Sequence, residues 1–240
     1  SANRSDRQPD LETLQIAQAR RVFGPQVPET ATDQRHNFNL VIQTLDEASA
    51  QQEARRCLQC DLLCNVCTTV CPNRANVAYA LDPIEYNVKQ VVRSAKDVRI
   101  EDLETESINQ PFQIINIGDF CNECGNCTTF CPTGGAPYQV KPKFYLTPQS
   151  FETENNGYMF DSGVLKARVD GRPESVTRHA GHLIYEAPDI RARLNLETFA
   201  VEEATLLSDA DGPINLRHAA QMAVLYTALK DLPILKHSIA

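Results

Sequence analysis

Nine cysteines lie within residues 57–131, and none follows in the rest of the chain. Within each group they are separated by two or three residues, their total is odd, and the N-terminal sequence is polar with no hydrophobic signal region. Cysteines with these properties are not typical of a disulfide framework. Soft thiolate ligands suit iron–sulfur clusters and zinc, so the pattern predicts metal ligation.

The cysteines form two copies of one loop, offset by 60 residues. Residues 64–72 read CNVCTTVCP and residues 124–132 read CGNCTTFCP, so three cysteines, two threonines and the proline are identical. The second copy, extended back to Cys121, has the spacing Cys-x2-Cys-x2-Cys-x3-Cys-Pro of a bacterial-type [4Fe–4S] loop. In such loops three cysteines hold one cluster and the fourth, followed by proline, ligates the other cluster.

Crossed ligation predicts two [4Fe–4S] clusters and assigns eight cysteines to them. The first cluster is expected on Cys60, Cys64, Cys67 and Cys131, and the second on Cys121, Cys124, Cys127 and Cys71. One cysteine is left over, because Asp61 occupies the position that aligns with Cys121. Cys60 is nearer to the regular spacing, and Cys57 stays open as the alternative to it.

Structural zinc is the simplest alternative, since Cys-x2-Cys pairs also form tetrahedral zinc sites. Zinc sites usually place two pairs a dozen or more residues apart, with no reason for compact four-cysteine runs that end in Cys-Pro. Histidine gives no support for a zinc site, because the five histidines form no ligand pattern (His36, His179, His182, His218 and His237). Gly125, Gly134 and Gly135 are expected to let backbone amides turn toward cluster sulfur.

Several elements are expected around the ligand loops. A helix from about Leu45 to Cys57 is predicted, with Thr44 and Glu47 as a capping box. Residues 76–81 and 112–117 are expected as short strands, and the charged stretch 89–106 between them as solvated and partly helical. Further on, the dipeptide Asp170-Gly171 predicts a hairpin, the alternation over residues 190–197 a half-buried strand, and residues 214–230 a terminal amphipathic helix.

Composition excludes some functional classes. The formal net charge is −8 with no run of Lys or Arg, which argues against nucleic acid or an anionic membrane surface as the main partner. No apolar stretch approaches 18 residues, so no membrane span is expected and the cytoplasm is the expected compartment. The sequence contains no Gly-x-Gly-x-x-Gly or Walker motif and no evident catalytic site.

The residues around the cysteines resemble a known family. The stretch 53–60 (EARRCLQC) is similar to the entry of the iron–sulfur region in glutamate synthase small subunits, where both of the first two cysteines are ligands. Residues 64–77 and 121–132 resemble more specifically the C-terminal part of the selenate reductase subunits. The resemblance implies kinship with large FAD-containing, NAD(P)H-linked iron–sulfur proteins that are associated with molybdenum hydroxylases. It is strong over residues 50–145, and the chain lacks the flavin and pyridine-nucleotide domain of that family.

The sequence thus predicts an α+β fold in three parts. An approach segment and helix (1–56) precede a ferredoxin-like 2[4Fe–4S] core (57–145), and a small antiparallel sheet with a terminal helix follows (146–240). The expected function is single-electron transfer within a multi-component oxidoreductase, next to a flavoprotein that reacts with NAD(P)H. A non-redox scaffold held together by iron–sulfur clusters or zinc is the alternative.

Overall fold

The computed structural model describes residues 12–13, 16, 19–57, 64–94, 97–208 and 212–236 of the 240-residue chain. The chain divides into two compact units, residues 1–64 and 65–240, which are treated separately below. None of the helices in the described ranges has the length and apolar character needed to cross a membrane. Cys60 lies outside the described residues.

The first unit contains the 3-10 turn η1 (Thr32–Gln34) and the helix α2 (Glu47–Ala54). The Asp46 carboxylate caps α2 by accepting a 2.7 Å hydrogen bond from the Ser49 amide. The predicted helix is therefore confirmed, but its cap is Asp46 rather than Thr44. Both residue types are good N-caps, and the side chain that reaches the third amide of the first turn defines the start of the helix.

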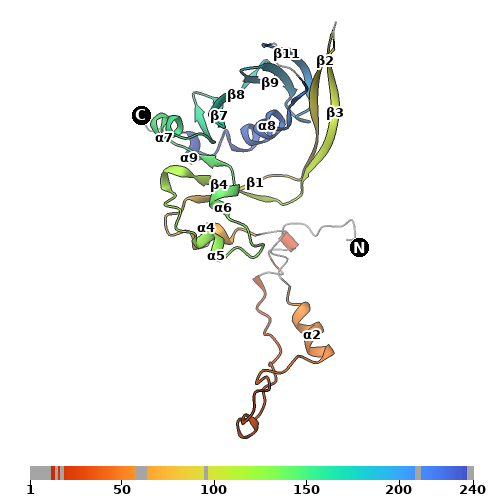
Figure 1. The fold of residues 1–240 in the computed structure, drawn as a ribbon, viewed down its shortest axis with the longest axis vertical. Helices are drawn as coiled ribbons and strands as arrows, with labels where there is room; N and C mark the ends of the chain where they lie inside the picture. Colours follow the sequence, from red (N-terminus) through yellow and green to blue (C-terminus); the bar gives the residue numbers. More distant parts are fainter. Residues whose placement is uncertain are drawn as a thin grey trace. The chain divides into compact units, whose positions relative to one another are not determined.

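In the described part of the second unit, nine strands form one mixed sheet (Figure 1). Neighbours pair in the order β1-β4-β5-β6-β7-β8-β9-β10-β11, parallel at β4–β5 and β5–β6 and antiparallel elsewhere. The strands are β1 (Asn76–Ala80), β4 (Phe112–Ile117), β5 (Lys143–Phe144), β6 (Gly157–Asp161), β7 (Val164–Val169), β8 (Arg172–His179), β9 (His182–Ala187), β10 (Ile190–Asn195) and β11 (Val201–Leu206).

Tight turns explain why β6 to β9 follow one another as hairpins. Each turn has two residues with positive φ, and the second is glycine, as type I′ turns require. In the predicted hairpin, Asp170 and Gly171 have φ values of 50° and 78°, so this prediction is confirmed. The same geometry recurs at Ser162-Gly163 and Ala180-Gly181.

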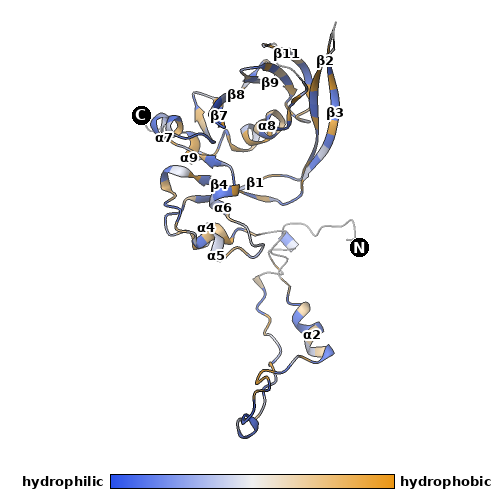
Figure 2. Ribbon diagram, viewed as in Figure 1, coloured by the Kyte–Doolittle hydropathy of each residue, from blue (hydrophilic) through white to orange (hydrophobic). Residues whose placement is uncertain are grey.

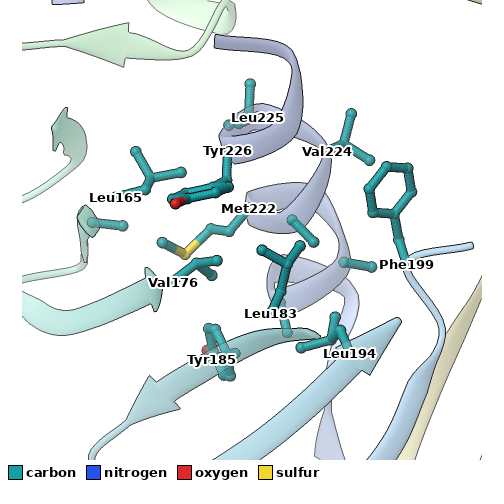
Figure 3. Close-up of a cluster of buried hydrophobic side chains, with 14 of the residues drawn as sticks. Leu165, Val176, Leu183, Tyr185, Leu194, Phe199, Met222, Val224, Leu225 and Tyr226 are labelled. Atoms are coloured by element: carbon teal, nitrogen blue, oxygen red, sulfur yellow. The ribbon is translucent and has the colours of Figure 1, made fainter. Parts of the chain in front are cut away.

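The helix α8 (Arg217–Leu229) packs against the curved sheet (Figure 1). Leu165, Val176, Leu183 and Leu194 point from the strands toward Met222 on the helix, as Figure 3 shows. All five side chains are fully buried, so burial of the apolar helix face stabilises the docking of α8. The predicted terminal helix is confirmed over these residues. Its expected start is instead the short strand β12 (Ile214–Asn215).

A second, smaller sheet has the strand order β12-β2-β3, with β2 (Ile84–Ser94) and β3 (Asp97–Ile108) as a long antiparallel pair. The prediction that residues 89–106 are partly helical is therefore wrong, whereas residues 101–105 are exposed, in agreement with the expected solvated stretch. Figure 2 shows hydrophilic and hydrophobic residues alternating along both strands. A register shift between Val88 and Lys89 breaks this alternation, so that the buried Val88 and Val91 are three residues apart instead of two.

The expected ferredoxin-like fold is also wrong. The strands β1 and β4 beside the cysteine motifs do not form a separate small core, because β4 continues through β5 into the nine-stranded sheet. The helices are few and mostly short in the described residues. Apart from α2 and α8 they are α4 (Val66–Val70), η2 (Gly118–Phe120), α5 (Asn126–Thr129), α6 (Pro137–Val140), α7 (Pro148–Thr153) and α9 (Pro233–Lys236).

Candidate functional site

The two cysteine motifs of the second unit meet at their short helices. Cys67 on α4 and Cys127 on α5 are 9% and 7% exposed, and both pack against Ile114 of β4. The helices α4 and α5 contact each other, so the two copies of the sequence repeat lie side by side (Figure 1). The fold thus brings together thiols that are 60 residues apart in the sequence.

The loop after each motif directs a backbone amide at a cysteine sulfur. The Ala75 amide donates to Cys71 Sγ over 3.2 Å, and the Gly135 amide donates to Cys131 Sγ over 3.3 Å. The residue before each donor has positive φ, 54° at Arg74 and 70° at Gly134. The two loops therefore have the same turn, and the prediction that Gly134 and Gly135 turn an amide toward sulfur is confirmed at Cys131.

A buried pair of asparagines, which the sequence analysis missed, ties this region to the sheet. Asn76 and Asn116 stand opposite each other on β1 and β4. The Asn116 amide donates to Asn76 Oδ1 over 2.9 Å, and the Asn76 amide donates to the Cys67 carbonyl over 3.1 Å. The sequence contains one asparagine in each of these two mostly apolar strands. Their positions, which pair in the antiparallel register, could have indicated this contact.

Four of the predicted ligands line one small cavity. Cys71, Cys121, Cys124 and Cys127 surround it, and these are the four residues assigned to the second cluster by crossed ligation. The buried Asn76 and Asn116 and Tyr138 also line it. Its volume is about 10 Å³, about the least that holds one water molecule.

Cys131 has an environment that favours its thiolate. The Thr133 hydroxyl lies 3.3 Å from the sulfur. This hydrogen bond, with smaller contributions from the Thr133 and Gly135 amides and the charge of Lys141, lowers the pKa of Cys131. Because the thiolate is the form that ligates metals, these contacts suit a ligand.

The ligands predicted for the first cluster are only partly described. Cys67 and Cys131 belong to the second unit, whereas Cys64 is the last residue of the first unit and is half-buried. Cys57, the alternative ligand, is exposed at the end of the stretch that follows α2, and Cys60 lies outside the described residues. The structure therefore does not decide between Cys57 and Cys60.

Within the described ranges, no three Cys, His, Asp or Glu side chains are arranged to hold a single metal ion. A cubane makes a different demand, because its four cysteines bind four separate iron atoms and need not converge on one point. The donor set of the small cavity, four thiols with amides directed at neighbouring sulfur, fits the chemistry of such a cluster.

About half of the chain is similar in sequence to known proteins. The chain is 32% identical over 127 residues to “Putative oxidoreductase YgfK” of Escherichia coli (strain K12), and equally to the protein of that name in Escherichia coli O157:H7. The match covers 52% of this chain but only 10% of each relative, so the chain spans about a tenth of the relatives' length. No protein-family description and no solved structure matches the chain. The similarity supports a relationship of about half of the chain to a protein named as a putative oxidoreductase.

Proposed function

We propose that this chain is the electron-transfer part of a multi-component oxidoreductase, in which it relays single electrons through two [4Fe–4S] clusters. The observation that carries the proposal is the doubled loop. Two copies of one cysteine motif lie side by side, and each directs an amide at the sulfur of its Cys-Pro cysteine.

The second cluster would be held by Cys121, Cys124, Cys127 and Cys71. Support for this set comes from the small cavity that these four residues line. The first cluster would be held by Cys60, Cys64, Cys67 and Cys131, with Cys57 as the alternative to Cys60. Its support comes from the sequence spacing and from the second motif, to which Cys131 belongs.

When bound, a [4Fe–4S] cluster takes up and releases one electron at a time. The residues of this chain determine how easily that happens. The amides of Ala75 and Gly135 stabilise negative charge on the sulfurs that they contact, which favours the reduced state. Ile114, buried in one hydrophobic cluster with Cys67 and Cys127, helps to exclude water from this part of the site.

The proposed partner is a flavoprotein that oxidises NAD(P)H. Clusters exchange single electrons, so a chain with clusters and no nucleotide motif needs a neighbouring flavin to divide a hydride into two electrons. The matched part of this chain covers only 10% of each relative, which is consistent with a flavin domain elsewhere in the same polypeptide or assembly. A molybdenum hydroxylase as the electron acceptor and a cytoplasmic location complete the proposal.

Metal analysis tests this function directly. An anaerobically purified sample should hold about eight iron and about eight acid-labile sulfide per chain, and dithionite should produce the paramagnetic signal of reduced clusters. A redox titration then separates electron transfer from a scaffold role, since a scaffold would show no reversible reduction in the physiological range. Zinc without sulfide would contradict the proposal.

A mixing experiment tests the need for a partner. NADPH or NADH alone should leave the brown absorbance of the isolated chain unchanged, and addition of the native flavoprotein should bleach it. If the flavoprotein causes no bleaching, the chain does not act as its electron acceptor and the scaffold alternative is favoured.

A further inference from the structure

A large cavity lies within the second unit, and Ile114, which clusters with the buried Cys67 and Cys127, is one of the residues that line it. Its volume is about 850 Å³, within the roughly 300–1,000 Å³ typical of small-molecule sites. Residues of β1, β4, β6 and α8 line it, together with the end of β3 and the segment 139–143. Nothing in the sequence motifs pointed to this cavity.

Its walls are rich in tyrosine. Four of the seven tyrosines of the chain line it: Tyr79, Tyr86, Tyr145 and Tyr158. Burial raises the pKa of Tyr79 and of Tyr158 to about 12, so both hydroxyls stay protonated; that of Tyr158 is engaged by His218. Tyrosine rings offer flat apolar surfaces for stacking together with a polar tip, which suits a planar ligand that carries hydrogen-bonding groups.

A hydrogen-bonded network fixes two of the side chains that line the cavity, Tyr158 and His218. His218, in the first turn of α8, lies 2.8 Å from the Tyr158 hydroxyl through Nε2 and 2.5 Å from Glu174 Oε2 through Nδ1. The Tyr185 hydroxyl also donates to Glu174, over 2.8 Å. Tyr158 and His218 are thus held in place before any ligand arrives, which lowers the entropic cost of binding.

Carboxamide side chains supply polar groups around the cavity. Gln113 and Gln139 line it with their amides bonded to neighbouring groups of the chain. Asn155 and Gln221 also line it, and among the described residues their side-chain amides have no hydrogen-bond partner. A carboxamide both donates and accepts, so it complements the carbonyl and N–H edges of a nitrogen heterocycle.

Arg168 contributes an unpaired positive charge. Its Nε is buried and has no hydrogen-bond partner within the described part of the chain. Glu106, an acidic residue of the same wall, is engaged by Tyr86 and Arg217. No carboxylate of the described residues forms an ion pair with this half-buried arginine, so an anionic group on the ligand would balance its charge at the terminal guanidinium nitrogens.

We propose that this cavity binds a planar nitrogen heterocycle that carries an anionic group, with the ring among the tyrosines and the anion at Arg168. Binding itself does not depend on the proposed electron transfer. One link to it exists: Ile114 lines the cavity and belongs to the same hydrophobic cluster as Cys67 and Cys127.

Flavin mononucleotide and riboflavin are suitable probes, because they share one planar nitrogen heterocycle and only the first carries a phosphate. Equilibrium dialysis against the purified chain, with flavin measured after extraction, should show saturable binding of one flavin mononucleotide per chain. Riboflavin should bind at least about tenfold more weakly, as expected for loss of a charge-assisted hydrogen bond. Iron and sulfide are counted in the same samples, so failure of flavin binding is distinguished from failure of cluster binding.

Two variants and a matched control complete the experiment. Arg168→Gln should abolish the preference for flavin mononucleotide over riboflavin, whereas Arg172→Gln, at an exposed arginine paired with Asp189, should retain it. Gln221→Leu, on α8, should weaken both flavins equally and provides the test if Arg168→Gln fails to fold. Absence of saturable binding by the wild-type chain, or a phosphate preference that survives in folded Arg168→Gln, would overturn the proposal.

Discussion

Substitution of the buried asparagines tests whether the Asn76–Asn116 pair positions the cysteine motif. Asn76→Leu removes the donor to the Cys67 carbonyl and leaves the Asn116 amide without its acceptor. A lost hydrogen bond of about 0.5–1.5 kcal/mol and a buried unpaired amide of about 1–3 kcal/mol give an expected loss of about 2–4 kcal/mol in unfolding free energy.

Asn116→Leu should cost less, although Asn116 is the more deeply buried of the two residues. It leaves Asn76 Oδ1 unpaired, at about 1–3 kcal/mol, but it also removes Asn116 Oδ1, a buried atom with no partner among the described residues. These two effects are similar in size and opposite in sign, so the lost hydrogen bond to Asn76 leaves a net loss of about 0.5–1.5 kcal/mol. The double variant should lose less than the sum of the single ones, because no amide then remains unpaired.

Urea unfolding of the four proteins, prepared anaerobically with equal iron content and followed by tyrosine fluorescence, measures these differences. The chain contains no tryptophan, so the tyrosine signal is not masked. Asn109→Leu, at an exposed asparagine in the connection between β3 and β4, is the control and should change stability by less than about 0.5 kcal/mol. Equal losses for the two single variants, or strictly additive ones, would refute the reasoning.

Three further predictions concern the cluster ligands and the His218 network. Cys131→Ala should remove the first cluster and leave the second, measured as a fall from about eight to about four iron per chain with an altered spectrum of the reduced protein; loss of the second cluster alone would contradict crossed ligation. Cys57→Ser should leave iron content unchanged while Cys60→Ser removes one cluster, and the reverse result would assign the ligand to Cys57. Although burial opposes ionisation, the hydrogen bond and charge of His218 lower the pKa of Glu174 below its ordinary value of 4.5. This contribution to stability is present above about pH 4.5 and is lost as pH falls through the lowered pKa, so thermal melts of Glu174→Gln should show a weaker acid dependence than the wild type below pH 4.5.

Local patterns in the sequence determined several elements of the fold. The Asp170-Gly171 turn, the strand at residues 112–117 and the helix that begins near residue 217 depend on turn chemistry, apolar periodicity and capping, which act over a few residues. The cysteine repeat was equally evident, because ligand spacing within a loop is a local property.

Other features depended on contacts between distant residues. The ferredoxin-like expectation was wrong because β4 pairs with β5 across 25 intervening residues, and no local pattern indicates that the sheet continues there. The β2–β3 pair was missed because the register shift after Val88 breaks the two-residue period by which a strand is identified.

The sequence by itself determined which side chains could ligate metal, since cysteine type and spacing restrict the chemistry whatever the surrounding fold. Only the tertiary structure decided that Cys71 lines the same cavity as Cys121, Cys124 and Cys127, and that four tyrosines line a second, larger cavity. Cavities are formed by side chains from strands and helices far apart in the chain. Their position therefore follows from packing of the whole unit, which no single segment encodes.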